Sequence, residues 1–173
     1  MFVGSIYNSI DDKNRMFIPA KYCDAFDIRH LSGENESKEQ AAPGKLRKDY
    51  EGKCMIFHGS APSLYVYAIK EYERFLSDLD SVREGDEDVE DLIWHISSTS
   101  SNLDIDKQGR VTIPQSAVKY AGLSKEIVTV GMIRNLEIWD RDAFEQRKPD
   151  KDVKTLLNHA RKRISEKRTQ EQE

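Results

Sequence analysis

The chain has 173 residues, of which 38% are hydrophobic, and its 27 basic and 31 acidic residues give a formal net charge of −4. This length suits one domain or two small halves that share a core, and the negative balance excludes a uniformly basic coat for nucleic acid. The sequence has no apolar run near the roughly 20 residues that span a bilayer, no basic and apolar start typical of a secretion signal, and only two cysteines. We therefore expect a cytoplasmic protein without a membrane partner or a disulfide framework.

The charge is unevenly distributed along the chain. Residues 71–91 contain ten Asp/Glu and two Arg, a net charge of −8, whereas residues 141–173 contain ten Lys/Arg and seven Asp/Glu, a net charge of +3. Both segments are typical of solvated helix surface. The total charge therefore describes no single face of the protein.

An internal repeat is the most informative feature. Ile10–Pro19 and Ile105–Pro114 share Ile, Asp, Arg, Ile and Pro at a constant offset of 95. A second match, Gly59 with Leu64–Tyr67 against Gly131 with Leu136–Trp139, follows at an offset of 72. Two copies of one unit usually pack against each other, and we expect a pseudo-twofold axis between them. The change of offset places 23 extra residues in the first copy, and we expect a polar loop insert near 32–53.

The expected elements alternate strands and helices. In chain order they are a hairpin around residues 10–18, a short helix after Pro19, a hairpin over 54–68, helices near 69–82 and 88–97, a hairpin over 102–113, a short helix after Pro114, a hairpin over 126–139, a helix near 140–147 and a charged helix near 150–168. The domains predicted from this are a first repeat (1–82), a helical linker (83–101), a second repeat (102–147) and a charged C-terminal helix or tail (148–173).

Each copy contains a turn of the same chemistry. An Asp at the start and a Gly at the end of Asp106–Gly109 are typical of a type I turn closed by a residue at positive φ. The first copy has Asn14 where the second has Gly109, and Asn is the non-glycine residue most tolerant of that conformation. We predict that Asp11, Asn14, Asp106 and Gly109 fix the two turns.

An arginine follows each Asp by four residues. The Asp could simply pair with it and brace the hairpin, and for one turn alone this interpretation is the simpler one. A pseudo-twofold axis, however, makes the two turns related basic tips, which suit the phosphates and grooves of duplex DNA. The candidate DNA-binding residues are therefore Lys13, Arg15, Lys107 and Arg110.

The two motifs resemble the signatures of the bacterial MraZ proteins, which are tandem members of the AbrB-like, swapped-hairpin group. Met1–Gly4 and the run Ala121–Trp139 are similar to that family as well, so the resemblance covers about residues 1–147 without the insert. It implies an α+β fold in which two tandem β-hairpin/helix repeats form one pseudo-twofold swapped-hairpin barrel, with a C-terminal helix added. By position, Asp11, Lys13 and Arg15 match the first signature, and Asp106 and Arg110 match the second.

The resemblance also implies a function. It is that of a sequence-specific DNA-binding regulator, a repressor, of the division and cell-wall gene cluster, which binds repeated elements in promoter DNA as a ring-shaped homo-oligomer associated with the nucleoid. Val3 stands where many members carry arginine, and Ser97–Ser101 stands where the family tends to have an aromatic pair. Two alternatives remain open, an AbrB-like antitoxin whose tail wraps a toxin and an oligomeric assembly protein without affinity for DNA.

Other chemistry finds little support in the sequence. Cys54 and His58 could belong to a zinc site with Cys23 and His30, but four residues on a strand separate them by about 13 Å, too far for one metal. We expect no metal, no cofactor and no enzyme activity. Two further segments, the Trp94–Ile96 region and the apolar stripe of residues 153–164, are expected to pack, the first in the core or an interface and the second on the body or a neighbour.

Overall fold

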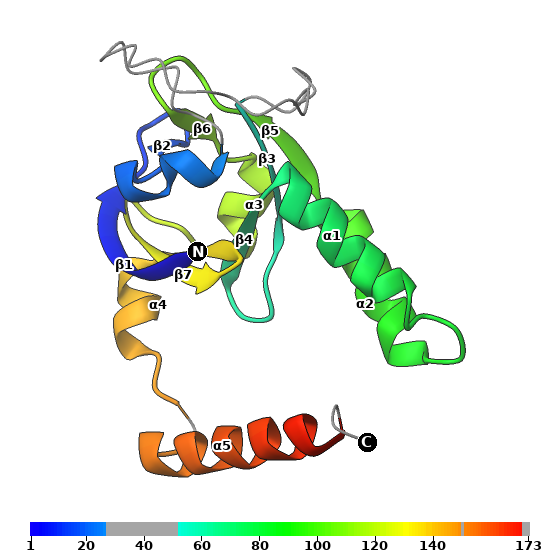
Figure 1. The fold of residues 1–173 in the computed structure, drawn as a ribbon. Helices are drawn as coiled ribbons and strands as arrows, with labels where there is room; N and C mark the ends of the chain where they lie inside the picture. Colours follow the sequence, from blue (N-terminus) through cyan, green and yellow to red (C-terminus); the bar gives the residue numbers. More distant parts are fainter. Residues whose placement is uncertain (27–51, 150, 171–173) are drawn as a thin grey trace, which may run out of the picture.

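The computed structural model describes residues 1–26, 52–149 and 151–170 of the chain (Figure 1). Most of the insert expected near 32–53 lies outside the described residues. The described elements are β1 (Phe2–Ser9), β2 (Arg15–Phe17), the 3₁₀ helix η1 (Ala20–Phe26), β3 (Lys53–His58), β4 (Ser63–Ala68), α1 (Ile69–Asp80), α2 (Glu87–Thr99), β5 (Ser101–Asp104), β6 (Arg110–Thr112), α3 (Gln115–Tyr120), β7 (Glu126–Ile133), β8 (Asn135–Asp140), α4 (Arg141–Gln146) and α5 (Val153–Gln170). The protein is therefore a mixed α+β fold.

The strands form one antiparallel sheet of six strands and a second sheet of two. The larger sheet has the order β1-β7-β8-β4-β3-β5, and β2 pairs with β6 in the smaller one. At both edges of the larger sheet, the outermost strand pairs with a strand of the other repeat. β1 of the first repeat pairs with β7 of the second, and β5 of the second repeat pairs with β3 of the first. Each repeat thus supplies a strand that completes the other.

Two of the pairing registers repeat between the two copies of the sequence motif. In the β4–β8 pair, Leu64 lies opposite Ile138 and Val66 lies opposite Leu136. Replacing each residue of the first pair by its counterpart 72 positions away gives the second pair. Beside the β2–β6 pair, Ile18 N donates to Gly109 O and Ile113 N donates to Asn14 O. Replacing each residue of the first bond by its counterpart 95 positions away gives the second bond. The sequence repeat is therefore also a repeat in space.

The hairpin predicted over 102–113 is wrong in one respect. Its turn is present, since Asp106 N donates to Arg110 O at 2.8 Å and Gly109 N donates to Asp106 O at 2.8 Å. Its two strands then separate, because β5 pairs with β3 in the large sheet while β6 pairs with β2 in the small one. Leu103 and Val111 reach the common core from these different sheets, and burying both apolar faces requires the separation.

The hairpins over 54–68 and 126–139 are present as β3–β4 and β7–β8, with one change of alignment. Cys54 pairs with Ala68 and Ile127 pairs with Asp140, so β3 matches β7 at an offset of 73 while β4 matches β8 at 72. Five residues separate the paired His58 and Leu64, whereas four separate the corresponding pair Gly131 and Leu136. Gly59 and Gly131, which share an offset of 72 in the sequence, are consequently not equivalent in the structure.

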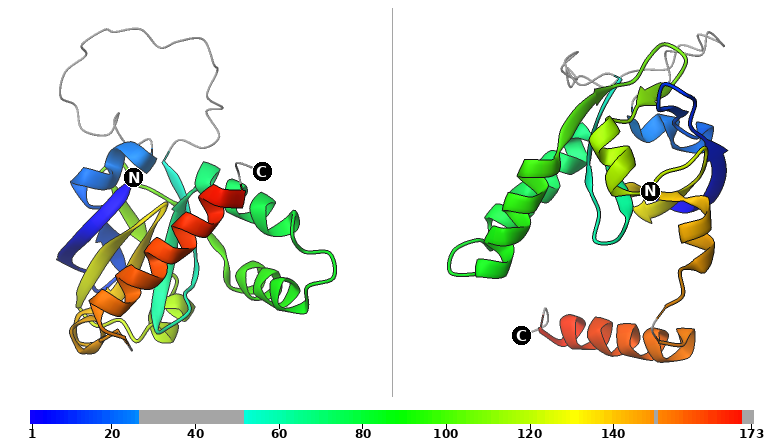
Figure 2. Two further views of the ribbon diagram at one scale, coloured as in Figure 1. Left: turned by 60° about the horizontal axis from the view of Figure 1, so that its bottom comes forward. Right: turned by 180° about the vertical axis from the view of Figure 1, so that it is seen from behind.

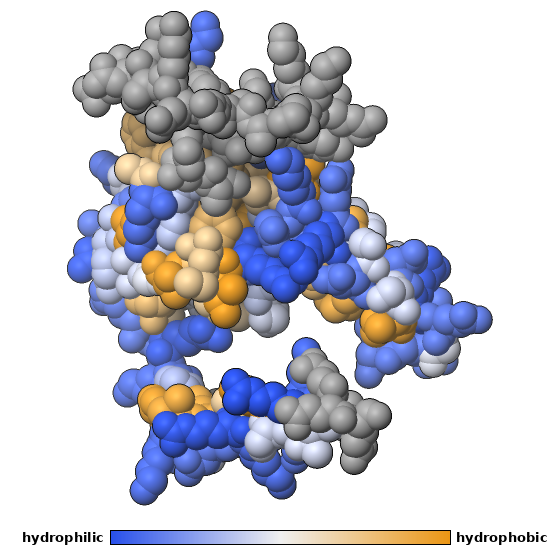
Figure 3. Space-filling model, viewed as in Figure 1, coloured by the Kyte–Doolittle hydropathy of each residue, from blue (hydrophilic) through white to orange (hydrophobic). Residues whose placement is uncertain are grey.

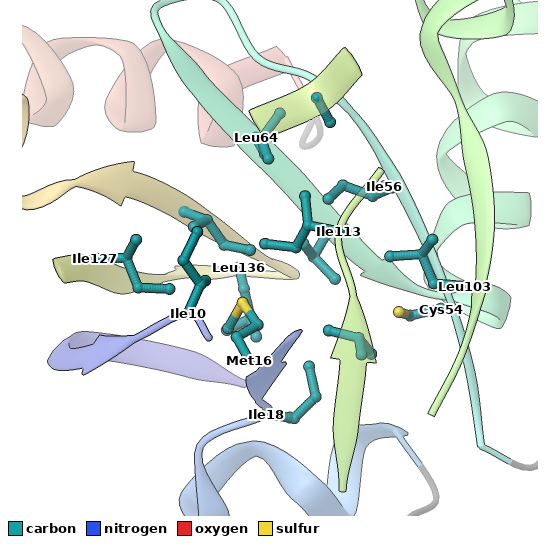
Figure 4. Close-up of a cluster of buried hydrophobic side chains, with 14 of the residues drawn as sticks. Ile10, Met16, Ile18, Cys54, Ile56, Leu64, Leu103, Ile113, Ile127 and Leu136 are labelled. Atoms are coloured by element: carbon teal, nitrogen blue, oxygen red, sulfur yellow. The ribbon is translucent and has the colours of Figure 1, made fainter. Parts of the chain in front are cut away.

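Two clusters of buried side chains hold the fold together. The larger one lies between the small sheet and the large one, where Met16, Ile113, Ile127 and Leu136 point toward one another (Figure 4). The smaller one lies beneath α1 and α2 and consists of Phe57, Tyr67, Tyr72 and Ile96, with partly buried neighbours around them. The first cluster joins the two repeats, and the second attaches the helical hairpin to β3 and β4.

The C-terminal helix stands apart from this body. Two views from opposite sides show α5 separated from the sheet and from α1 and α2 (Figures 1 and 2). Every described residue from Lys151 to Thr169 is exposed. The apolar stripe of residues 153–164 therefore does not pack on the body of its own chain.

Candidate nucleic-acid interface

The two predicted turns have the same hydrogen bonds. Asp11 Oδ1 accepts from the backbone N–H groups of Lys13 and Arg15, both at 2.9 Å. Asp106 Oδ1 accepts from those of Gln108 at 2.9 Å and Arg110 at 3.0 Å. The aspartates therefore fix the turns, as their position at the turn start predicts.

Each aspartate also holds the side chain of its arginine. Asp11 Oδ2 accepts from Arg15 Nε at 2.8 Å and forms an ion pair with Arg15 Nη2 at 2.6 Å. Asp106 Oδ2 accepts from Arg110 Nε at 2.8 Å and forms an ion pair with Arg110 Nη2, also at 2.8 Å. The Asp–Arg brace considered from the sequence is thus present in both turns.

The brace leaves one edge of each guanidinium open. A guanidinium has five N–H donors, and the aspartate engages one on Nε and one on Nη2. Of the remaining three, one on Nη1 and one on Nη2 form the end-on edge, which is suited to contact a phosphate or the O6 and N7 atoms of guanine. Bracing the turn and contacting DNA are therefore compatible in the same arginine.

Both arginines lie on one exposed face of the small sheet. Arg15 pairs with Thr112 and Phe17 pairs with Arg110, and these four side chains alternate with the buried Met16 and Val111. Arg110 lies over the ring of Phe17, 5.9 Å from its centroid, and Phe17 is 56% exposed. The face therefore combines two cations with one exposed aromatic ring.

The electrostatics of the two turns are coupled. The side-chain hydrogen bond from Arg15 lowers the pKa of Asp11 to about 2, and the same bond raises the pKa of Arg15, with a smaller contribution from Asp106 in the other turn. Burial alone would raise the pKa of Asp106, but the hydrogen bonds from Arg110 and Gln108 lower it overall. Asp11, Arg15 and Asp106 therefore stay ionised at neutral pH, and the two turns are near enough to affect each other.

The residues at the turn ends adopt the backbone conformation that the sequence predicts. Asn14 has φ of 57° and Gly109 has φ of 77°, a region that favours Gly and Asn. Asn14 Nδ2 also donates to Gln115 Oε1 at 2.7 Å, which links the first turn to the start of α3. Lys13 and Lys107 are exposed beside the tips.

Two members of this surface, Phe17 and Gln115, were not among the residues nominated from the sequence. Phe17 lies between the buried Met16 and Ile18, so the two-residue period of a strand places it on the outer face. Gln115 gives no such signal, because its contact with Asn14 depends on the packing of one repeat against the other.

The zinc hypothesis fails on the geometry. Cys54 and His58 lie at opposite ends of β3, and burial raises the pKa of the Cys54 thiol to about 12, so it is not a thiolate at neutral pH. His30 lies outside the described residues. Within the described ranges, no group of three or more His, Cys, Asp or Glu side chains could hold a metal, and no helix is long and apolar enough to cross a membrane.

Comparison with known proteins gives a consistent result. A family model described as "MraZ protein, putative antitoxin-like" matches residues 97–162. The transcriptional regulator MraZ of Clostridium botulinum (strain Eklund 17B / Type B) is 31% identical over 144 residues, which are 83% of this chain and 84% of that protein.

The chain belongs to the MraZ family. The MraZ regulator of Thermobifida fusca is 32% identical over 144 residues, 83% of this chain and 84% of its own length. That of Dictyoglomus thermophilum is 28% identical over 166 residues, 96% of this chain and 97% of its own. The similarity to MraZ proteins therefore extends over both turns and both hairpins.

Proposed function

We propose that this MraZ family member is a sequence-specific DNA-binding transcriptional repressor of the division and cell-wall gene cluster. It binds repeated elements in its promoter as a ring-shaped homo-oligomer, through Arg15 and Arg110 with Lys13 and Lys107 beside them. The observation that carries this proposal is the pair of turns with matching hydrogen bonds that expose the same guanidinium edge. The relatives named above as transcriptional regulators support the regulatory role.

The fold proposed for this function is the swapped-hairpin barrel of the AbrB-like group, with the repeats at 1–82 and 102–147. The pairing of β1 with β7, of β5 with β3 and of β2 with β6 supports it, since each pair joins one repeat to the other. Such a barrel holds the two basic tips at a fixed separation. Ring assembly then multiplies weak contacts per chain by effective concentration.

The test is retention of a labelled DNA fragment from the region upstream of the chain's own gene. Arg15→Ala and Arg110→Ala should each weaken binding by about 10- to 100-fold, the loss of one arginine contact to a base. Arg134→Ala is the matched control, because this exposed arginine lies outside the turns and pairs with Asp78. Wild-type affinity should fall steeply with salt, as phosphate contacts require.

Three outcomes would contradict the proposal. Unchanged retention by Arg15→Ala and Arg110→Ala would remove the assigned residues from the interface. Oligomers that retain no upstream DNA at low salt would favour an assembly protein. Purification with a toxin encoded by a neighbouring gene would favour an antitoxin.

A further inference from the structure

The first of two complementary surfaces is on α5. With 100° per residue, Val153, Leu156, Leu157 and Ile164 fall within one stripe about 100° wide, and all four are exposed. Three arginines border this stripe, Arg161 and Arg168 on one side and Arg163 on the other. The helix carries six Lys/Arg and one Glu, a net charge of +5. It is an apolar strip with cationic margins.

The second surface is the outer face of α2. Ile96 is fully buried against the sheet, and Trp94, two residues earlier, points about 200° away from it and is 72% exposed. Glu87, Glu90 and Asp91 lie seven, four and three residues before Trp94, on the same face of the helix. The segment Ile69–Thr99 has ten Asp/Glu and three Lys/Arg, a net charge of −7. An exposed aromatic ring is therefore bordered by carboxylates.

We propose that α5 of one copy of this chain docks on the outer face of α2 of a second copy. The leucines of α5 cover Trp94, and the bordering arginines of α5 face Glu87, Glu90 and Asp91. Figure 3 shows apolar surface between hydrophilic side chains on α5. Charge and apolar character are thus complementary on the two surfaces, and Trp and Arg are the residue types that dominate such contacts.

The structure also says why the partner is a second copy rather than the same chain. Arg147 lies over the ring of Trp139, 5.0 Å from its centroid, and Lys148 and Pro149 line a hollow with Tyr7 beside α4. The start of the linker is thus held near β1 and β8, whereas α2 packs on β3. Although α5 runs from there toward the side of α1 and α2 (Figure 1), it does not pack on them, because every described residue from Lys151 to Thr169 is exposed.

Other occupants fit the surfaces less well. DNA would neutralise the arginines of α5 and leave Leu156 and Leu157 in water. A membrane with anionic lipids would cover both the charges and the leucines of α5, but would leave Trp94, Glu87 and Asp91 exposed to solvent. A second copy satisfies both surfaces with one contact, and because the contact is head-to-tail it generates a ring or a chain of copies.

The experiment measures the mass of the full chain by light scattering after gel filtration. The wild type should have a mass several times 20.0 kDa, and both Leu156→Ser/Leu157→Ser and Trp94→Ser should reduce the mass of the main species at least twofold. These side chains are exposed, so circular dichroism should be unchanged. Trp94 emission should shift to shorter wavelength on assembly, against the constant signal of the buried Trp139.

A charge exchange makes the test specific. Arg161→Glu/Arg168→Glu and Glu87→Lys/Asp91→Lys should each dissociate the assembly, and the four changes together in one chain should restore it. Lys162→Glu is the control, because it reverses one charge on the opposite face of α5 and should leave the mass unchanged.

The inference rests on the homo-oligomer in the proposed function, but its readout is mass and not DNA binding. A wild type that remains a monomer, or a leucine variant with wild-type mass, would overturn it. So would a leucine variant that keeps its mass and loses binding to duplex DNA or to anionic vesicles. Arg15→Ala should keep the wild-type mass, so that failure of the DNA-binding assignment and failure of this contact are distinguishable.

Discussion

Asp11 and Asp106 organise the candidate interface by acting on backbone and side chain at once. Each carboxylate uses one oxygen for two backbone N–H groups of its turn and the other for the guanidinium. The arginine is therefore held in one orientation before any ligand arrives, which reduces the side-chain entropy lost on binding.

The pKa of Asp11 is a direct measure of this brace. In Arg15→Ala, its pKa should rise from about 2 toward 3.8, because the largest cause of the shift is removed. A lowered pKa stabilises the folded state above the unfolded value of 3.8, and this contribution is lost as the pH falls through about 2. Carboxyl carbon chemical shifts measured against pH test this. Arg110→Ala is the control and should leave the Asp11 titration unchanged.

Asn14 tests the conformation of the first turn. Asn14→Ala should lower the free energy of unfolding by about 1–2 kcal/mol, because an alanine is strained at positive φ. Asn14→Gly should be close to neutral, since glycine relieves the strain but loses the hydrogen bond to Gln115. Urea denaturation compares the two. Equal destabilisation by both variants would mean that the Gln115 contact, and not the backbone, matters at this position.

At the scale of elements, β1 and β7 make the longest strand pair among the described residues, eight residues on each side. Gly131 lies opposite Gly4 in this pair, and a Cβ atom at Gly131 would lie 2.6 Å from the carbonyl carbon of Phe2 and 2.8 Å from the hydroxyl of Tyr22. A glycine is therefore needed for β1 and η1 to approach β7 as closely as they do.

Gly131→Ala should consequently destabilise the protein by about 1–3 kcal/mol, the usual cost of overpacking. The damage should be local, with faster amide exchange along Phe2–Ser9. Ser5→Ala, on the exposed side of the same strand, is the control and should have little effect. Slow exchange in β1 of the Gly131→Ala variant would show that β7 can shift to accommodate the methyl group.

The sequence predicts most elements but few of their partners. The Asp and Gly of Asp106–Gly109 predict the turn, since its geometry depends on those residues alone. Leu103 and Ile105 alternate with polar residues, as do Val111 and Ile113. This pattern predicts buried faces, but it does not tell whether the two strands pair with each other or with β3 and β2. Register is decided by contacts between residues distant in the chain. For this reason, the sequence match of Gly59 with Gly131 differs by one residue from the alignment of β3 with β7 in the structure.

Within the candidate site, too, the sequence predicts the local motif but not the contacts that depend on side-chain geometry. Arg15 and Arg110 could be nominated because their motif occurs twice, whereas the open edge of each guanidinium depends on side-chain geometry. Packing was expected for Trp94 because it lies beside Ile93 and Ile96, but the 3.6-residue period places it on the opposite face from Ile96. Helical phase would have predicted its exposure.

At the scale of the whole molecule, His58 joins three elements. Its ring, on β3, stacks on Tyr120 of α3 with centroids 3.8 Å apart, and its carbonyl contacts His95 Nε2 of α2 at 3.0 Å. Burial lowers the pKa of His58, and the nearby His95 lowers it further. The helical hairpin and the second repeat are thus linked through one histidine that is neutral at pH 7.

Stability should therefore fall in mildly acidic solution. Because the pKa of His58 is lower in the folded protein than its ordinary value of 6.5, the unfolded state binds the proton more readily. The stabilisation is complete above pH 6.5 and is lost as the pH falls toward the folded pKa. Urea denaturation at pH 7.5 and 5.0 should show a smaller difference for His58→Gln than for the wild type. His159→Gln, on the exposed α5, should behave as the wild type.

The exchange of outer strands has a consequence for synthesis of the chain. β1 is made first, but its partner β7 begins at residue 126. At about 5–20 residues per second, the ribosome needs on the order of 10 s to reach that point. During this time Phe2–Ser9 has no native strand beside it, and its apolar residues depend on chaperones or transient contacts for protection. A ribosome that stalls in the second repeat would release a first repeat that cannot close its own sheet.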